Sequence, residues 1–496
     1  MHDRYGGSNL RKDQKTEMQQ LTPQDTVFLS IETPELPTHI GGLVFLRPEE
    51  GSEFGFAAFA EFVRERLGVV DRFSWQLQEV PFGLDRPYWV KRENFDTADH
   101  LHEIRLPAPY SHESLSKLVG RIFERPMDRS RPLWDMTLIG GLPGGRYAVL
   151  WRTHHCMMDG ASGASLSEQL FDIAPDAKRE IATKLSEDAT AGERLSTSKI
   201  YGRAMMNASA LPQKQSKYLG QIAKSLLTKD EKETEYKAGS STSESESDSN
   251  VLAPKSPLNG VVGPHRGLAW SSISLSDVKR IKNTLGVTIN DVVLAITGGA
   301  VRDYLEARDG LPSKSLIASV PVSMRAKGDT AIGNQIRELP IYWGTDCEDP
   351  IERLTAIHNH ASEAKRQAHE GDSFDLIGMV SEALLPGALN LLMRGAAKAG
   401  DHMPLPANAV VSNVPMAPMP LYCAGALIER VVPLSLLAPT QGLNITVLSY
   451  CGELHFGLIH DPALVPEAWD LAGLIGKNLQ KLQGAVDREL EDPIGA

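Results

Sequence analysis

The sequence predicts a mixed α/β protein of two domains, and three observations lead to this expectation. The chain has 496 residues, which is more than one hydrophobic core usually serves. From residue 21 to about 175, and again after residue 258, short apolar runs alternate with segments of helical periodicity. Between these regions, residues 231–257 are rich in Ser, Glu and Lys and lack the apolar side chains that a core requires. We therefore expect two α/β units joined by a long linker.

The expected domain boundaries follow from these changes in composition. Residues 1–20 have no apolar period and are expected to form a disordered tail. The first domain is then expected to cover residues 21–176. Residues 177–257 are expected to be a linker that is partly helical, from about residue 198 to 228, before it becomes disordered. The second domain is expected to occupy residues 258–490.

In the first domain, the pattern predicts a strand that ends at a pair of histidines. Residues 147–152 (YAVLWR) are a short apolar and aromatic run, which is typical of a buried strand. Residues 164–173 after it predict a helix. Ser111 is expected to cap an earlier helix whose apolar side chains fall on one face, namely Leu115, Leu118, Val119, Ile122 and Phe123.

The second domain shows the same alternation of helix and strand. Ser276 is expected to cap a short helix that ends near Gly286, where glycine favours a helix end. A longer helix is expected before Gly310. We expect that long helix to cover residues 290–308. We also expect two buried strands (316–322 and 408–412), a hairpin over 443–460 that turns at Cys451 and Gly452, and a final amphipathic helix (466–486).

The composition is that of an ordinary globular protein, with 42% apolar and 23% charged residues. The formal net charge of −12 argues against nucleic acid as a partner, because phosphate binding requires a basic face. The four cysteines are scattered without a CxxC pair, which favours reduced thiols in the cytoplasm. No secretory signal and no run of about 18 apolar residues is visible. We therefore expect a cytoplasmic protein without a spanning helix.

The densest group of chemically active residues is the run HHCMMDG, residues 154–160. A histidine between the end of a strand and the start of a helix is held rigidly and can face a cleft. Because imidazole titrates near pH ~6.5, His155 can accept a hydroxyl proton at neutral pH. Asp159 can hold the loop or orient the ring, and Gly160 permits a tight turn. The run therefore indicates general base catalysis.

Other interpretations of this run stay open on the residues alone. A metal site would need further ligands, and His-His-x3-Asp is not the helical zinc pattern, so we expect no metal. His154 and His155 can instead be buried, hydrogen-bonded side chains at a strand end. A serine nucleophile would require a GxSxG turn, which the sequence lacks. Cys156 is expected to pack away from His155 rather than to act as a nucleophile.

Further segments accompany this run in a fixed order. Residues 21–46 read LTPQDTVFLSIETPELPTHIGGLVFL. The others are Arg131-Pro132-Leu133-Trp134, Asn290-Asp291-Val292-Val293-Leu294-Ala295, Pro321-Val322-Ser323-Met324-Arg325, Ser412-Asn413-Val414-Pro415 and Gly442-Leu443-Asn444-Ile445-Thr446. HHxxxDG occurs in transferases of the chloramphenicol-acetyltransferase-like fold, and the whole set resembles the bacterial wax ester synthase/diacylglycerol acyltransferase family. The resemblance covers about residues 21–175 and 260–485.

The resemblance implies two similar chloramphenicol-acetyltransferase-like domains, with an active-site tunnel at their interface that His155 faces. It implies transfer of a long-chain acyl group from acyl-CoA to a lipid alcohol, with acyl-CoA as a substrate and no cofactor. His155 would be the general base, and no acyl-enzyme would form. His154 would support the neighbouring ring and Asp159 would steer the loop. Gly160, Asn290 and Asp291 are assigned to substrate binding, although Asn and Asp are also ordinary helix caps.

Two other functions are compatible with parts of this pattern. One is a condensation-type transferase with a carrier-bound donor, but no carrier attachment signature accompanies the motifs. The other is a non-catalytic coat protein of lipid inclusions, which would have no need of His155, Asp159 and Asn290. Met416-Ala417-Pro418 stands where the family often has Gly-Pro after SNVP, which leaves the acceptor alcohol open.

A lipid-modifying enzyme without a spanning helix needs another way to reach its substrates. We expect peripheral contact with the inner face of the membrane or with lipid inclusions. The apolar segment 377–393 is interpreted first as a buried core helix and second as a pocket wall or a membrane-dipping surface. Under the second interpretation, aspartate at Leu389 or Leu392 would abolish recruitment to lipid.

Overall fold

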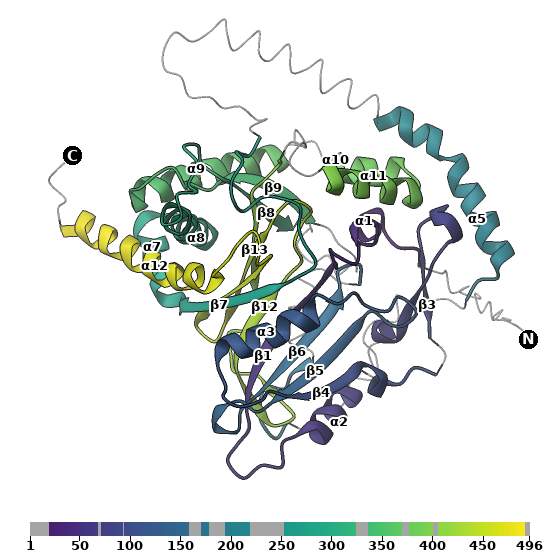
Figure 1. Cartoon of the computed structure of the whole chain (residues 1–496), viewed down its shortest axis with the longest axis horizontal. Helices are drawn as coiled ribbons and strands as arrows, with labels where there is room; N and C mark the ends of the chain where they lie inside the picture. The colour runs from purple at the N-terminus through teal and green to yellow at the C-terminus, as the bar shows by residue number, and fades with distance from the viewer. Residues whose placement is uncertain are drawn as a thin grey trace, which may run out of the picture.

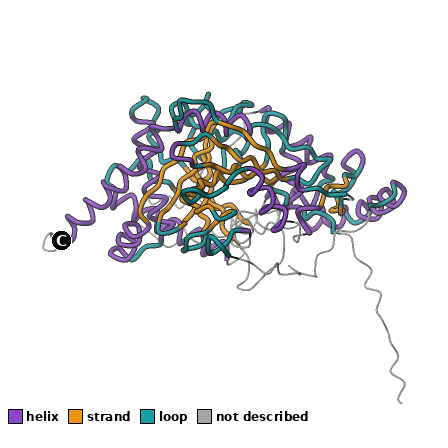
Figure 2. The backbone as a smooth tube through the Cα atoms, turned by 90° about the horizontal axis from the view of Figure 1, so that it is seen from below, coloured by secondary structure: helices purple, strands orange, loops and turns teal. Residues whose placement is uncertain are grey.

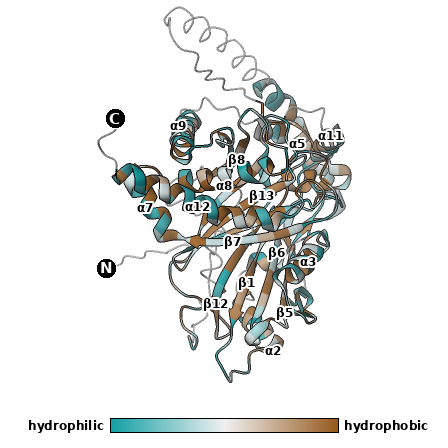
Figure 3. Cartoon of the chain, turned by 60° about the vertical axis from the view of Figure 1, so that its left-hand side comes forward, coloured by the Kyte–Doolittle hydropathy of each residue, from teal (hydrophilic) through white to brown (hydrophobic). Residues whose placement is uncertain are grey.

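In the computed structural model, the described residues are 19–67, 71–92, 94–157, 170–177, 194–218, 252–323, 336–369, 376–399 and 405–491. Their strands form two six-stranded sheets and one two-stranded sheet. Most of the strands lie in the middle of the molecule with helices outside them, and a small group of strands lies toward one end (Figure 2). In Figure 3 the central strands carry much of the hydrophobic colour, whereas α7 and α12 alternate in colour along their length. The expected mixed α/β fold is confirmed.

The first sheet has the strand order β11-β12-β1-β6-β5-β4. At its centre, β1 pairs in antiparallel register with both β6 and β12. Helices α1, α2 and α3 belong to this half of the molecule (Figure 1). The bounds are α1 Pro23–Ile31, β1 His39–Arg47, α2 Phe56–Leu67, β2 Trp75–Gln78, β3 Tyr88–Lys91, β4 Leu101–Arg105, α3 His112–Phe123, β5 Trp134–Gly140 and β6 Tyr147–His154, with short 3-10 helices at η1 Asp71–Ser74, η2 Pro81–Gly83, η3 Thr97–His100 and η4 Pro143–Gly145.

The second sheet has the order β7-β14-β13-β10-β8-β9. Helices α7, α8, α9 and α12 contribute apolar side chains to one large core with its strands. The bounds are α5 Thr197–Ser209, β7 Gly267–Ser274, α7 Leu275–Leu285, α8 Ile289–Glu306, β8 Ile317–Ser323, β9 Ile336–Tyr342, α9 Pro350–His369, α10 Leu376–Ala383, α11 Pro386–Ala399, β10 Ala409–Pro415, β11 Tyr422–Cys423, β12 Ala426–Leu434, β13 Leu443–Tyr450, β14 Glu453–His460 and α12 Ala468–Glu491.

The two sheets do not follow the boundary expected at residue 258. Strands β11 and β12 come from the C-terminal half of the chain but complete the N-terminal sheet through β1. β12 also contacts β13 and β14 of the second sheet. The approach is close at Gly457, where an added Cβ would lie 1.8 Å from the Pro433 carbonyl oxygen. The crossing strand therefore joins the two halves into one body.

Most of the predicted elements occur close to their expected positions. β6, β8, β10, α8, α12 and the β13–β14 hairpin confirm the predictions, and Cys451 and Gly452 have the positive φ that a tight hairpin turn requires. Ser111 caps α3 in a capping box with Ser114. The cap of α7 was wrong: it is Ser274 rather than Ser276, because the helix begins directly where extended β7 ends. The helix expected over 164–173 falls largely outside the described residues.

The apolar segment at residues 376–393 forms two helices instead of one. α10 and α11 are separated at Leu384 and Leu385, just before Pro386. Leu389 is 2% exposed, so it belongs to the interior, whereas Leu392 is 50% exposed. The two leucines are therefore not equivalent surface positions, and aspartate at Leu389 would test folding rather than lipid contact.

Within the described residues, no single helix has the length and apolar composition needed to cross a membrane. The pair α7 and α8 passes that test only when combined, across a bend of 108°.

Candidate active site

His155 lies in the turn that follows β6, a strand near the middle of the first sheet. Its backbone N–H donates to the carbonyl of Thr38 at 3.0 Å, and the N–H of Met157 donates back to His154 at 2.9 Å. Thr38 immediately precedes β1, the neighbour of β6. Of residues 154–157, His155 is the one that is not buried. The sheet thus fixes the main chain of His155 while the residue as a whole stays partly exposed.

The imidazole of His155 stacks on the ring of Phe28. The ring centroids are 3.9 Å apart and the planes differ by 15°. Phe28 belongs to α1, which begins with Pro23 and is capped by Thr22, whose Oγ1 accepts from the backbone N–H of Asp25 at 3.0 Å. Stacking covers one face of the imidazole and restrains the ring, and its Nδ1 is buried.

The neighbouring His154 is fully buried and supports the turn. Its Nδ1 accepts from the backbone N–H of Cys156 at 3.1 Å, so in the neutral ring the proton is assigned to Nε2. Nε2 lies 2.9 Å from Thr38 Oγ1, and the Thr38 hydroxyl donates to the Phe28 carbonyl at 3.0 Å. This directed chain ties the turn that carries His155 to the helix that carries Phe28. The structure thus shows His154 holding the main chain of the turn, and the support of the His155 ring expected from it stays a prediction.

A buried carboxylate completes the cluster. Glu32 Oε1 lies 3.4 Å from His154 Nε2, and Arg129 donates to Glu32 Oε2 at 2.6 and 3.0 Å. Burial raises the pKa of Glu32, but the hydrogen bond with His154 and the charge and hydrogen bonds of Arg129 outweigh it and lower the pKa to about 2. Glu32 is therefore ionised at neutral pH and stabilises the Arg129 guanidinium at the base of the site.

The other predicted residues of the HHxxxDG run divide into two groups. Asp159 and Gly160 lie outside the described residues, so the roles assigned to them stay predictions. Cys156 is completely buried, and burial together with the Asp25 carboxylate raises the pKa of its thiol well above the ordinary value. The packing role expected for Cys156 is therefore supported, because a buried neutral thiol is a poor nucleophile.

Replacing Cys156 by alanine is expected to preserve transfer activity. The change leaves the Cys156 backbone donor to His154 in place and removes only a buried sulfur, which costs roughly 1 kcal/mol of stability. Activity of the purified variant and its urea midpoint check this prediction. An inactive variant with an unchanged urea midpoint would show instead that the thiol takes part in the reaction.

Asp291 has a structural position at the start of α8. Its Oδ2 accepts from the Thr288 N–H at 2.9 Å in a capping box, and His358 of α9 lies 2.7 Å from the same oxygen. Asp291 is 1% exposed, while Asn290 is half-buried. The geometry favours the helix-cap interpretation over the substrate-binding role assigned to Asp291. The role assigned to Asn290 stays a prediction.

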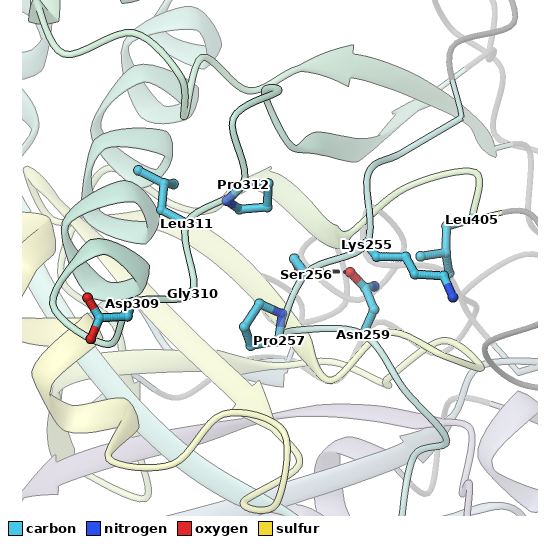
Figure 4. A pocket seen from close by; sticks show the side chains of 9 residues that line it. All are labelled: Lys255, Ser256, Pro257, Asn259, Asp309, Gly310, Leu311, Pro312 and Leu405. Carbon is cyan, nitrogen blue, oxygen red and sulfur yellow. Dashed lines mark hydrogen bonds between the residues drawn. The ribbon is translucent and has the colours of Figure 1, made fainter.

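A surface pocket of about 430 Å³ lies apart from these residues (Figure 4). Its polar side chains serve the fold: Ser256 donates to Asn259 at 2.9 Å, and the Asn259 amide donates to the Asn408 and Thr440 carbonyls. The lining residues are Lys255, Ser256, Pro257, Asn259, Asp309, Gly310, Leu311, Pro312 and Leu405. None of them belongs to the His155 cluster, so this pocket is not assigned to the reaction. The expected tunnel stays a prediction.

Sequence comparison places this geometry in a known family. Residues 21–293 match the wax ester synthase/diacylglycerol acyltransferase catalytic domain, and residues 332–483 match the C-terminal domain of the same family. The chain belongs to the wax ester synthase/diacylglycerol acyltransferase family. The predicted acyltransferase activity is thereby confirmed at the level of the family, and the resemblance proposed from the motifs is confirmed as well.

The relatives of this acyltransferase cover almost its whole length. A probable diacylglycerol O-acyltransferase of Mycobacterium tuberculosis is 31% identical over 95% of this chain and 100% of its own. An O-acyltransferase of Acinetobacter baylyi is 30% identical over 95% of this chain and 98% of its own. The solved wax ester synthase/diacylglycerol acyltransferase of Marinobacter aquaeolei covers 95% of this chain and 100% of its own, with 27% identity and a TM-score of 0.67. A condensation domain of the CDA synthetase shares the fold, with a TM-score of 0.51, 17% identity, and 95% of this chain and 96% of its own covered.

The residues that support His155 in this acyltransferase were not singled out from the sequence. Phe28, Glu32 and Thr38 lie within residues 21–46, the segment that resembled the family's opening segment. Arg129 lies two residues before the Arg131–Trp134 motif. The sequence therefore offered one sign of their importance, which is that they lie in or beside segments that resemble the family. The contacts that link these four residues to the turn after β6 are visible only in the structure.

Replacing Phe28 by leucine is expected to lower kcat by about tenfold, because the flat face that restrains His155 is lost while apolar volume is largely kept. KM should change little. Phe28→Tyr keeps the ring and serves as the matched rescue variant. Steady-state kinetics of both variants check the prediction. An equal loss of kcat in the leucine and tyrosine variants would show that the aromatic ring stacked on His155 does not determine kcat.

Proposed function

We propose that this acyltransferase moves a long-chain acyl group from acyl-CoA to a lipid alcohol, with His155 as the general base. The observation that carries the proposal is the imidazole of the partly exposed His155, which stacks on Phe28 with 3.9 Å between ring centroids and is anchored through its main chain to Thr38. A ring held in this way can meet the hydroxyl of an acceptor without losing its orientation.

The chemistry needs two bond changes at the carbonyl carbon and two proton transfers through His155. The alcohol oxygen attacks the thioester carbonyl while the imidazole of His155 takes the hydroxyl proton. The tetrahedral intermediate then collapses, the C–S bond breaks, and the thiolate leaves and takes a proton from the imidazolium. The products are an ester and a free thiol, and the histidine returns to its neutral form. No acyl-enzyme and no cofactor are required.

We assign diacylglycerol as the main acceptor, which gives triacylglycerol, and a long-chain alcohol as a second acceptor, which gives wax ester. The family description and the names of the Mycobacterium and Acinetobacter relatives support acyl transfer of this kind. The proposed place of action is the cytoplasm, in peripheral contact with the inner face of the membrane or with lipid inclusions, because both classes of acceptor are held in lipid phases.

Product analysis tests the donor and the acceptor separately. The purified chain is incubated with radiolabelled palmitoyl-CoA or palmitoyl-loaded acyl carrier protein, and with diolein or hexadecanol. The proposal expects labelled triacylglycerol from palmitoyl-CoA and diolein, and less wax ester from hexadecanol. Ester formation from the carrier-bound donor alone would replace the proposed donor. Absence of ester from every combination would contradict the proposed activity.

A further inference from the structure

Exposed apolar side chains gather at one corner of the molecule. Eleven large apolar side chains among the described residues are exposed. Six of these come from η2 and the residue after it, from α5 and from α11: Phe82, Leu84, Met205, Met206, Leu391 and Leu392. In Figure 1, α10 and α11 lie above α1, and α5 runs beside them. Isolated exposed apolar residues are common, but a contiguous group marks an interaction surface.

Contacts between these elements show that the segments that carry these side chains lie next to one another. η2 packs directly on α11, because a Cβ added to Gly83 would lie 2.6 Å from the Gly387 nitrogen. The side chain of Asn207 in α5 donates to Asp85 at 2.7 Å, three residues after Phe82. Helical residues 211–218 lie beside α10, where Gln215 donates to the Ala383 carbonyl at 3.1 Å. We call this surface, formed by residues 82–85, 203–218 and 382–395, the apolar corner.

The outward face of α11 is apolar in a helical pattern. Ala388, Leu391, Leu392 and Gly395 are all exposed and fall at i, i+3, i+4 and i+7, on one side of the helix. The inward side chain Leu389 is 2% exposed. A soluble helix normally shows the opposite arrangement, with polar residues outside. Phe82 adds to this face: it is 87% exposed and has a left-handed backbone, with φ of 58°, a conformation that is costly for a bulky residue.

The charge of the apolar corner differs from that of the whole chain. The exposed basic residues are Arg203, Lys214, Lys217 and Arg394. Its two acidic residues are hydrogen-bonded within the fold, Asp85 to Asn207 and Glu382 to Tyr218. The chain as a whole carries a formal net charge of −12. Basic side chains around an exposed apolar face match an anionic lipid surface, which offers headgroup phosphates above acyl chains.

The apolar corner is also connected to the catalytic base. α11 and α10 pack on α1, and Asn390 of α11 donates to the Ser30 carbonyl of α1 at 2.8 Å. Phe28 of the same helix stacks on His155. α1 therefore contacts both α11 and the ring of His155, while Leu391 and Leu392 of α11 are exposed.

We propose that the apolar corner docks on an anionic phospholipid surface, and that this contact presents the lipid alcohol to the site next to α1. The delivery of the alcohol rests on the proposed function. Binding to lipid does not, because it can be measured without catalysis. Phe82, Leu391 and Leu392 enter the acyl region of the lipid surface, and the four basic side chains meet the headgroups.

Vesicle sedimentation of the full chain tests the docking surface. The vesicles are phosphatidylcholine alone or phosphatidylcholine with phosphatidylglycerol, and the test variant is Phe82→Ser/Leu391→Ser/Leu392→Ser. The matched control is Val261→Ser/Met419→Ser/Leu490→Ser, whose positions are also exposed but lie outside the apolar corner. The test variant is expected to lower binding to anionic vesicles by at least about tenfold, the equivalent of 1.4 kcal/mol. The control should bind like the wild type.

A charge variant and an assay with soluble substrates distinguish lipid docking from a general loss of activity. Lys214→Glu/Lys217→Glu/Arg394→Glu should remove the preference for anionic vesicles. Activity on diolein in vesicles should fall with the serine variant, whereas activity on hexanoyl-CoA and hexanol in solution should not. Equal binding by the test and control variants would overturn the proposal, as would a test variant that changes only the oligomeric state. If the wild type forms no ester and the serine variant still loses vesicle binding, the proposed function is refuted but the docking surface is not.

Discussion

Replacing His155 by alanine is expected to lower kcat for ester formation by about 10²–10⁴-fold. The variant keeps the Thr38 hydrogen bond, which involves the backbone, and loses the group that accepts the hydroxyl proton. Binding of the two long apolar substrates does not depend on the imidazole, so KM should change much less than kcat. Steady-state rates with palmitoyl-CoA and diolein, at matched protein concentration, provide the measurement.

Two control variants show whether such a loss is specific. His265→Ala removes an imidazole that is 76% exposed and far along the chain from the turn, so it should behave like the wild type. His155→Gln keeps a polar side chain of similar length but is no base at neutral pH, so it should be as inactive as the alanine variant. Substantial activity in either His155 variant would contradict general base catalysis by this residue.

Replacing Glu32 by glutamine is expected to destabilise the protein by about 3 kcal/mol at neutral pH. The pKa of Glu32 is about 2 in the folded protein and 4.5 without its partners, and its side chain is 6% exposed. The variant keeps the size of the side chain but leaves Arg129 without a counter-charge. Removing one partner of a buried pair is costly because the remaining charge stays poorly solvated. Urea unfolding at pH 7 measures the difference.

The pH dependence of that difference has a defined sign. Because the folded-state pKa of Glu32 is lowered, its contribution is complete above about pH 4.5 and is lost as the pH falls toward 2. The stability gap between wild type and Glu32→Gln should therefore shrink when unfolding is measured at pH 3 instead of pH 7. Glu79→Gln is the matched control, since Glu79 also contacts Arg129, at 3.3 Å, but is 56% exposed. A gap that is the same at both pH values would contradict this assignment.

The local elements and the catalytic histidine were within reach of sequence reasoning because their signals are local. The run of residues 147–152 shows strand character without its partners, and a hairpin turn at Cys451 and Gly452 needs only the residues around it. His155 stood out because an imidazole at the end of a buried strand can accept a proton at neutral pH, although the residues alone also allowed a buried, hydrogen-bonded histidine. The order of the short family motifs then favoured the catalytic interpretation of His155 over the interpretation as a buried structural histidine.

The remaining features depend on contacts between distant residues. β12 reaches the first sheet by pairing with β1, and nothing in an apolar strand states which of two sheets it joins. Glu32 and Arg129 are 97 positions apart in the chain, so their pairing has no local pattern. The same holds for Leu389 and Leu392: helical spacing separates their faces, but only the position of α1 decides which one is inside.

Thiol release from palmitoyl-CoA with and without a lipid alcohol tests direct attack at the His155 site more directly than any other measurement. The wild-type chain at high concentration is mixed with palmitoyl-CoA, and free thiol is followed over the first turnovers, before and after diolein is added. Direct attack predicts no thiol without the alcohol, steady release after its addition, and an unchanged protein mass throughout. A burst of thiol equal to the amount of enzyme in the absence of alcohol, with a palmitoylated protein, would contradict direct attack by the alcohol.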